Sequence, residues 1–189
     1  MEMTLDADRE PTLDGALWER YRDGDAAAFS SLYDRYAGLL QFFLQSLTRD
    51  PGRAEDLTHE TFLRLLGSDR DLPGAALRPY LFRIARNLAL DGIRRDSAHE
   101  RVRPLVVPVR DEGGPDAAAR QAESARAISE ALDRLPPEQR EAVILRVYGE
   151  FAWSEIAEIV GTSMATVASR YRYAVQKLAE LVPDPEEPR

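Results

Sequence analysis

The stretch WSEIAEIVGTSMATVASRYRYAVQKL, residues 153–178, has the spacing of two short helices packed across a tight turn. Ala157 is small enough to lie where the helices touch, Gly161 suits the turn, and Val167 can anchor the second helix on the first. Ser163 is a favourable N-cap for the second helix. The relative positions 0, +4 and +10 of Ala157, Gly161 and Val167 therefore predict a helix-turn-helix.

The second helix of this motif has a face suited to DNA. Its predicted inner stripe consists of Val167, Ala174, Val175 and Leu178. Small residues at its N-terminal end allow close approach to a major groove, and the helix dipole favours phosphate there. Arginine side chains can reach phosphates or guanine edges. The residues expected to contact DNA are Ser163, Met164, Ala165, Thr166, Ser169, Arg170 and Arg172. The alternative is a plain helical hairpin with solvated arginines.

A second basic element lies upstream, in YLFRIARNLALDGIRR, residues 80–95. Residues 78–103 hold seven arginines against three acids, and Pro79 suits the first turn of a helix. The predicted inner stripe is Leu77, Leu81, Ile84 and Leu88. Arginine and asparagine offer geometries that read phosphates and base edges, and aromatic rings can stack on unpaired bases. The candidate nucleic-acid contacts are Tyr80, Arg83, Asn87, Arg94 and Arg95.

The same residues allow plainer interpretations. Arg83 and Asn87 also fit a solvated helix face, and Tyr80 also fits the core. Phe82 fits the core better than a stacking role. Asp91 is expected to pair with Arg94, Arg95 or Asn87 rather than to contact DNA.

The segment AEDLTHETFLRLLG, residues 54–67, predicts a helix with one acidic face. Asp56, His59, Glu60 and Leu63 share that face at helical spacing, which indicates either a partner surface or a solvated helix. The letters HETFL also suggest a metalloprotease helix, but Leu63 stands where the second histidine would fall. The other histidine, His99, lies far away on a basic segment, so no zinc site, metal or cofactor is expected.

Composition limits the class of protein. The 189 residues carry a net charge of −8. This charge is unevenly distributed, because residues 1–30 hold eight acids against three arginines whereas residues 78–103 are basic. The absence of cysteine fits a reducing, cytoplasmic compartment. The start MEMTLDADRE does not resemble a signal peptide, and no stretch predicts membrane insertion.

The chain predicts an all-α protein with two small helical domains joined by a flexible linker, since no alternating strand pattern is present. Asp25 is a favourable N-cap for the long helix that follows it. The proline- and glycine-rich residues 104–123 indicate an extended linker rather than a core element. The expected divisions are an acidic N-terminus at 1–12, a first domain at 13–103, the linker, a second domain at 124–182, and an acidic tail at 183–189.

Three quoted segments resemble bacterial sigma factors. The stretch LDRLPPEQREAVILRVYGEFAWSEIAEIVGTSMATVASRYRYAVQKL is similar to their C-terminal domain, and AEDLTHETFLRLL and YLFRIARNLALDGIRR are similar to their N-terminal domain. The likeness runs in the expected order from about Trp18 to Leu181. Only a short linker lies where larger sigma factors carry a middle domain. The chain thus resembles the small extracytoplasmic-function (ECF) class of the sigma-70 family.

The resemblance implies a role for each segment. The C-terminal helix-turn-helix would read the upstream promoter element, and the basic helix would recognise and melt the start-proximal element, with the loop of residues 67–76 holding a flipped base. Asp56, His59, Glu60 and Leu63 would dock on polymerase. The implied partners are core RNA polymerase, double-stranded promoter DNA, the melted non-template strand and an anti-sigma factor.

The chain departs from the family pattern at several positions. His59 replaces a usual glutamine, Tyr80 replaces a usual tryptophan, and Ala152 replaces a common capping serine or threonine. Two tyrosines in ASRYRY, residues 168–173, are also unusual, which leaves the upstream sequence preference open.

Two other classes of protein remain as alternatives. A stand-alone helix-turn-helix regulator would bind DNA without polymerase, but it predicts one basic reading element, whereas this chain has two. An enzyme is not expected, because the sequence contains no glycine-rich phosphate loop, nucleophile–base set or metal cluster.

Overall fold

The computed structural model describes residues 12–68, 74–95, 104–107 and 115–181, without the side chains of 12, 74, 75 and 115–122. The described residues form helices and contain no strand, which confirms the predicted all-α class. The α-helices are α1 (Thr12–Arg22), α2 (Ala26–Thr48), α3 (Pro51–Leu66), α4 (Gly74–Arg95), α5 (Pro115–Asp133), α6 (Pro137–Val143), α7 (Trp153–Val160) and α8 (Met164–Leu181). A π-helical turn, η1 (Ile144–Tyr148), continues α6.

Local sequence explains how the first helices begin and end. Asp25 caps α2 as predicted, because its side chain accepts a hydrogen bond from the backbone N–H of Ala27 at 3.0 Å. Arg49 closes α2 in the left-handed region with φ of 59°, and Asp50 then caps α3. One prediction is wrong here: α4 begins at Gly74, so Pro79 lies inside the helix rather than in its first turn. Since Pro79 lacks an N–H, α4 loses one backbone hydrogen bond near its start.

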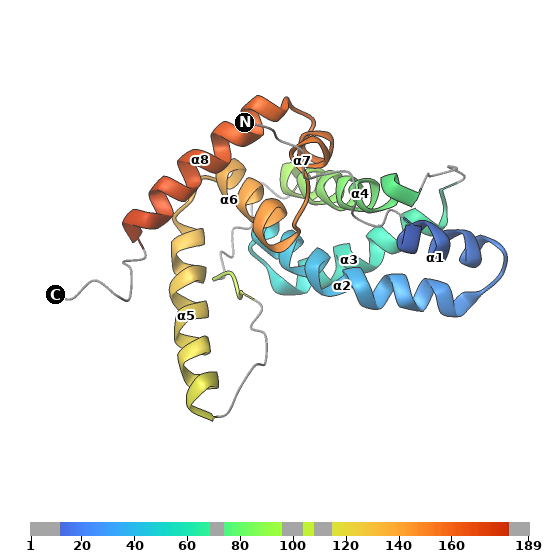
Figure 1. The fold of residues 1–189 in the computed structure, drawn as a ribbon, viewed down its shortest axis with the longest axis horizontal. Helices are drawn as coiled ribbons and strands as arrows, with labels where there is room; N and C mark the ends of the chain where they lie inside the picture. Colours follow the sequence, from blue (N-terminus) through green and yellow to red (C-terminus); the bar gives the residue numbers. More distant parts are fainter. Residues whose placement is uncertain (1–11, 69–73, 96–103, 108–114, 182–189) are drawn as a thin grey trace.

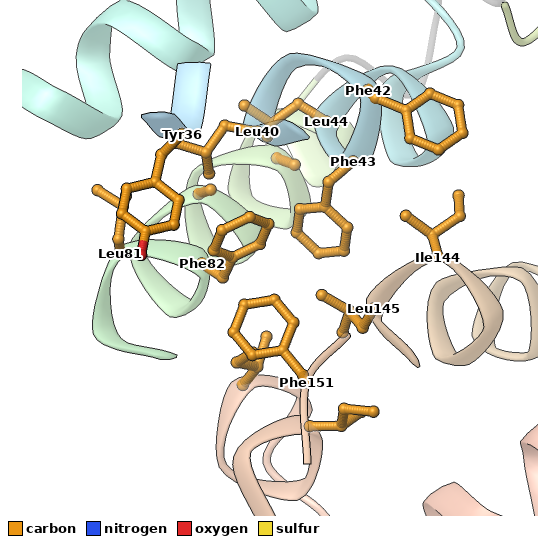
Figure 2. Close-up of a cluster of buried hydrophobic side chains, with 14 of the residues drawn as sticks. Tyr36, Leu40, Phe42, Phe43, Leu44, Leu81, Phe82, Ile144, Leu145 and Phe151 are labelled. Carbon is orange, nitrogen blue, oxygen red and sulfur yellow. The ribbon is translucent and has the colours of Figure 1, made fainter. Parts of the chain in front are cut away.

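One hydrophobic core extends through both halves of the chain. We call α1–α4 the N-terminal block and α5–α8 with η1 the C-terminal block. Phe43 of α2, Phe82 of α4 and Phe151, which precedes α7, are all fully buried and face one another (Figure 2). Helix α7 lies beside α4, whereas α5 projects away from the body of the molecule (Figure 1). The two blocks therefore pack directly on each other.

The segment predicted to be a linker contributes to this core, contrary to the sequence prediction. Leu105 and Val107 are buried, at 2% and 7% exposure, and the backbone N–H of Leu105 donates to Asp133 at 3.4 Å. The side chain of Gln45 donates to the carbonyl of Pro104 at 3.4 Å. Helix α5 also begins at Pro115, inside the expected linker. Burial of the apolar side chains at 105 and 107 favours packing of this segment on the core.

The turn η1 inserts an extra residue between α6 and α7. The N–H of Gly149 donates to the carbonyl of Ile144 at 2.9 Å, which is the i→i+5 pattern of a π-helix. Gly149 also fits a tight site, because a Cβ there would lie 2.6 Å from Cδ2 of Phe151 and 2.7 Å from the carbonyl oxygen of Leu145. The side chain of Arg146 donates to the carbonyl of Phe151 at 2.7 Å, which fixes the path of the chain into α7.

Candidate nucleic-acid interface

Helices α7 and α8 form the predicted helix-turn-helix. Gly161 closes α7 in the left-handed region with φ of 69°, and its N–H donates to the carbonyl of Ala157. Ser163 caps α8, since its hydroxyl accepts from the N–H of Thr166 at 3.1 Å. Val167 is buried at 1% exposure between the helices. Gly161, Ser163 and Val167 therefore have the roles that their spacing predicted.

Helix α7 begins without a side-chain N-cap, and Glu155 partly compensates for it. Ala152 has no side-chain oxygen to accept a hydrogen bond from the first turn. Instead the carboxylate of Glu155 accepts from the N–H of Ala152 at 2.7 Å, which is the reciprocal half of a capping box.

The outward face of α8 differs from the expected one in two ways. The buried or half-buried stripe follows Val167, Tyr171, Ala174 and Leu178, whereas Val175 is 43% exposed, so the prediction that Val175 faces inward is wrong. Tyr171 packs edge-on against Trp153, with ring centroids 5.3 Å apart. A spacing of 3.6 residues places Tyr171, four residues after Val167, on the buried side.

The residues of α8 and its N-cap that were predicted to contact DNA differ in solvent exposure. Ser163, Met164, Ala165 and Arg172 are exposed, and Thr166 and Ser169 are half-buried. Arg170 is also half-buried and lies near Glu141 of α6, where burial raises the pKa of the carboxyl and the charges of Arg86 and Arg170 oppose that rise. Sequence reasoning missed two exposed neighbours, Ala168 and Tyr173. The guanidinium of Arg172 lies over the ring of Tyr173 at 5.3 Å, a pairing that adjacent arginine and tyrosine letters signal.

The candidate face of α4 is partly occupied. Asn87, Arg94 and Arg95 are exposed, and Arg94 pairs with Asp91 at 3.5 Å, as expected for Asp91. Tyr80 is half-buried against the core, and the Arg83 guanidinium lies 5.4 Å from its ring.

Arg83 is not a simple solvated residue. It also pairs with Glu158 of α7 at 3.3 Å, a contact that the sequence did not predict. Phe82 is fully buried, which confirms the core interpretation for that residue.

The acidic face of α3 is brought together as the spacing predicted. Asp56 and His59 are exposed, Glu60 is half-buried, and Leu63 is 62% exposed although it is a large apolar side chain. Glu60 pairs with Arg64 at 2.9 Å. The hydroxyl of Tyr33 on α2 lies 3.1 Å from Nε2 of His59, a contact that the sequence analysis did not predict.

Some of the predicted segments lie outside the residues that the structure describes. Residues 69–73 of the loop predicted to hold a flipped base, most of the acidic N-terminus 1–12, and the tail 183–189 lie outside the described residues. Among the residues that the structure does describe, no three acidic or histidine side chains are grouped to hold a metal ion. Within the same ranges, no helix has the length and apolar character needed to cross a bilayer.

Comparison with known proteins identifies the family. The family model "Sigma-70 region 2" matches residues 32–99, and "Sigma-70, region 4" matches residues 125–178. RNA polymerase sigma factor CarQ of Myxococcus xanthus is 34% identical over 168 residues, which cover 87% of this chain and 94% of CarQ. The ECF RNA polymerase sigma factor SigL of Mycobacterium tuberculosis is 33% identical over 161 residues, which cover 82% of this chain and 88% of SigL.

A solved structure agrees on the fold. CnrH, determined in complex with the cytosolic domain of CnrY, superposes with a TM-score of 0.65 at 24% identity and covers 89% of this chain and 96% of CnrH. The chain therefore belongs to the sigma-70 family, as an RNA polymerase sigma factor of the ECF class. The alternative of a stand-alone regulator receives no support from these likenesses.

Proposed function

We propose that this chain directs core RNA polymerase to its promoters through three separate surfaces. The acidic face of α3 binds polymerase, the basic face of α4 recognises and melts the start-proximal element, and α8 reads the upstream element. The observation that carries this proposal is that both sigma regions match in chain order and cover the helices on which the three faces lie.

The proposal for α8 rests on a small and exposed N-terminal end. Ser163 and Ala165 are small and exposed, so they leave room for the phosphate backbone at the positive end of the helix dipole. The exposed Arg172 lies two turns further on, where it can reach a phosphate or a guanine edge. Since Arg170 is half-buried near Glu141, Arg172 is the stronger candidate for a base contact.

The proposal for α4 rests on its solvent-facing polar groups. Asn87, Arg94 and Arg95 are exposed along the C-terminal half of the helix, where they can contact phosphates of the start-proximal element. Tyr80 has one partly open face, and Arg83 lies over it, so the two together form a stacking platform for an unpaired base of the melted non-template strand.

The proposal for α3 rests on one exposed leucine among acids. Leu63 supplies an apolar anchor at 62% exposure, and Asp56 and Glu60 surround it with negative charge. Such a pattern fits a protein partner that presents a basic surface with an apolar pocket, and it would repel the DNA phosphates. His59, held near Tyr33, extends the same face.

An anti-sigma protein is a further partner that we propose, because CnrH, whose fold this chain shares, was solved with the cytosolic domain of CnrY. We also propose a cytoplasmic site of action and a regulatory rather than an enzymatic role, in keeping with the family.

The test combines transcription with co-purification. Start sites that depend on this chain are first mapped by inducing it, and one such promoter is then transcribed with purified core polymerase. We expect initiation only when the chain is present. Reversing charge at Asp56→Arg and Glu60→Arg should abolish co-purification with core polymerase while the circular dichroism spectrum stays helical.

The matched control is Glu19→Arg with Glu180→Arg, because both residues are exposed on other helices and the net charge changes equally. If the α3 variant still co-purifies with polymerase, or if both variants lose binding equally, the α3 assignment is wrong. Initiation without this chain would contradict the whole proposal.

A further inference from the structure

The first two turns of α8 present apolar side chains to the solvent. Helix α8 lies along the periphery of the molecule (Figure 1). Its first exposed side chains are those of Met164, which is 55% exposed, Ala165 and Ala168. Ala168 follows Met164 by four residues and Ala165 by three, so the three side chains are neighbours on the helix surface. We call Met164, Ala165 and Ala168 the apolar patch.

The polar groups beside the apolar patch are engaged or half-buried. The hydroxyl groups of Ser163 and Thr166 lie 2.9 Å apart, and Oγ of Ser163 also accepts from the N–H of Thr166. Ser169 is half-buried. Residues 162–169 contain no charged side chain, and the first exposed charge on α8 belongs to Arg172, about 12 Å along the axis from the first residue of the helix. The start of α8 therefore offers a DNA groove apolar contact rather than a charged or amide group.

This surface discriminates between the edges of the four bases. A recognition helix places its N-terminal residues against base edges in the major groove. Among the four bases, only thymine presents a methyl group there, and apolar side chains such as alanine contact it. A guanine or adenine edge against the same surface would give up hydrogen bonds to water without gaining a partner, which costs free energy. The apolar patch therefore favours thymine over the other bases.

We infer that the apolar patch reads thymine methyl groups, and so selects thymine in the part of the upstream element that faces the start of α8. The small side chains of Ala165 and Ala168 allow close approach, and the flexible thioether of Met164 supplies the larger contact area. Hydrogen-bonded reading of a base on this helix is then left to Arg172. This inference rests on the proposed function, because α8 must first lie in the major groove of that element.

The first measurement removes the methyl groups from the DNA. Deoxyuridine replaces thymidine one position at a time, on both strands of the upstream element of the promoter identified in the transcription test. Affinity for the complex of this chain with core polymerase is measured by gel-shift titration. At one or two positions we expect a loss of about fourfold, the factor that corresponds to burial of one methyl group. Loss at no position, or an upstream element without thymine on either strand, would overturn the inference.

The second measurement assigns the contact to the protein. We expect Met164→Ala to lower the thymidine-to-deoxyuridine affinity ratio from about fourfold toward unity, because it removes the side chain with the largest contact area. The matched control is Val175→Ala, which truncates another exposed apolar side chain of α8, about 16 Å further along the axis, and should keep the ratio. Arg172→Ala should weaken binding to both fragments by the same factor and so also keep the ratio. A ratio that Met164→Ala leaves unchanged, or that Val175→Ala lowers equally, shows that the methyl contact lies elsewhere and contradicts the inference.

The outcomes separate this inference from the proposed function. If polymerase carrying this chain initiates at the promoter but binds the thymidine and deoxyuridine fragments equally, the inference is wrong and the proposed function stands. If the chain directs polymerase to no start site, the proposed function fails and this inference fails with it.

Discussion

Removal of one partner from the buried Arg86–Glu141 pair should destabilise the protein strongly. Glu141 is 3% exposed as a residue and accepts both hydrogen bonds from Arg86, whose side chain is 19% exposed. Replacement by Glu141→Leu leaves a guanidinium with little access to water and no carboxylate. Breaking a buried pair in this way costs about 3–5 kcal/mol, whereas replacing both partners by apolar residues is often neutral or better.

Urea denaturation followed by circular dichroism measures this effect. We expect Glu141→Leu and Arg86→Met each to lower the free energy of unfolding, with the smaller loss for Arg86→Met because Glu141 then keeps the option of protonation. The double variant should recover most of the loss, which gives a large coupling energy in the double-mutant cycle. Additive losses with no recovery would refute the argument that charge desolvation, rather than lost packing, dominates this contact.

Three further predictions follow from the same structure. Arg172→Ala should weaken holoenzyme binding to the upstream element by about 1–3 kcal/mol in gel-shift titration, whereas Arg126→Ala, an exposed arginine on α5, should not. Gly149→Ala should lower the free energy of unfolding in urea by about 1–3 kcal/mol, because its Cβ would overlap the Phe151 ring at 2.6 Å; an unchanged midpoint would contradict that packing. Burial raises the pKa of Glu141, so between its unfolded-state and folded-state pKa values the folded state binds more protons than the unfolded state. The free energy of unfolding should therefore fall as pH rises across that interval. Urea titrations at a series of pH values measure this slope, and Glu141→Gln should remove it.

Signals that act over one helical turn could be predicted from the sequence. Asp25, Ser163 and Gly161 act through hydrogen bonds or backbone angles within a few residues of themselves, so their letters and spacing suffice. The same local reasoning placed Asp56 and Leu63 on one face of α3, because 3.6 residues per turn fixes that relation. The helix-turn-helix and the all-α class follow from such short-range rules.

Contacts between distant segments could not be predicted in this way. Arg86 and Glu141 are 55 positions apart, and Arg83 and Glu158 are 75 apart, so neither pair leaves a local pattern. Leu105 lies between prolines in a loop-like composition, yet it is buried because α5 and α2 happen to enclose it. Val175 and Tyr171 are both compatible with an apolar stripe, and only packing against Trp153 decides between them.

The π-helical turn η1 sets the rotational register of everything that follows it. One residue turns an α-helix by about 100° and advances it by about 1.5 Å, so a single inserted position changes which side chain faces α4. Val147 is 51% exposed within this turn, so its deletion would remove little buried surface. The deletion would nevertheless replace the i→i+5 hydrogen bonds of this turn by i→i+4 bonds. Phe151 would then be rotated away from its buried position against Phe82. One residue between α6 and α7 therefore determines whether the N-terminal and C-terminal blocks of this sigma factor can pack on each other.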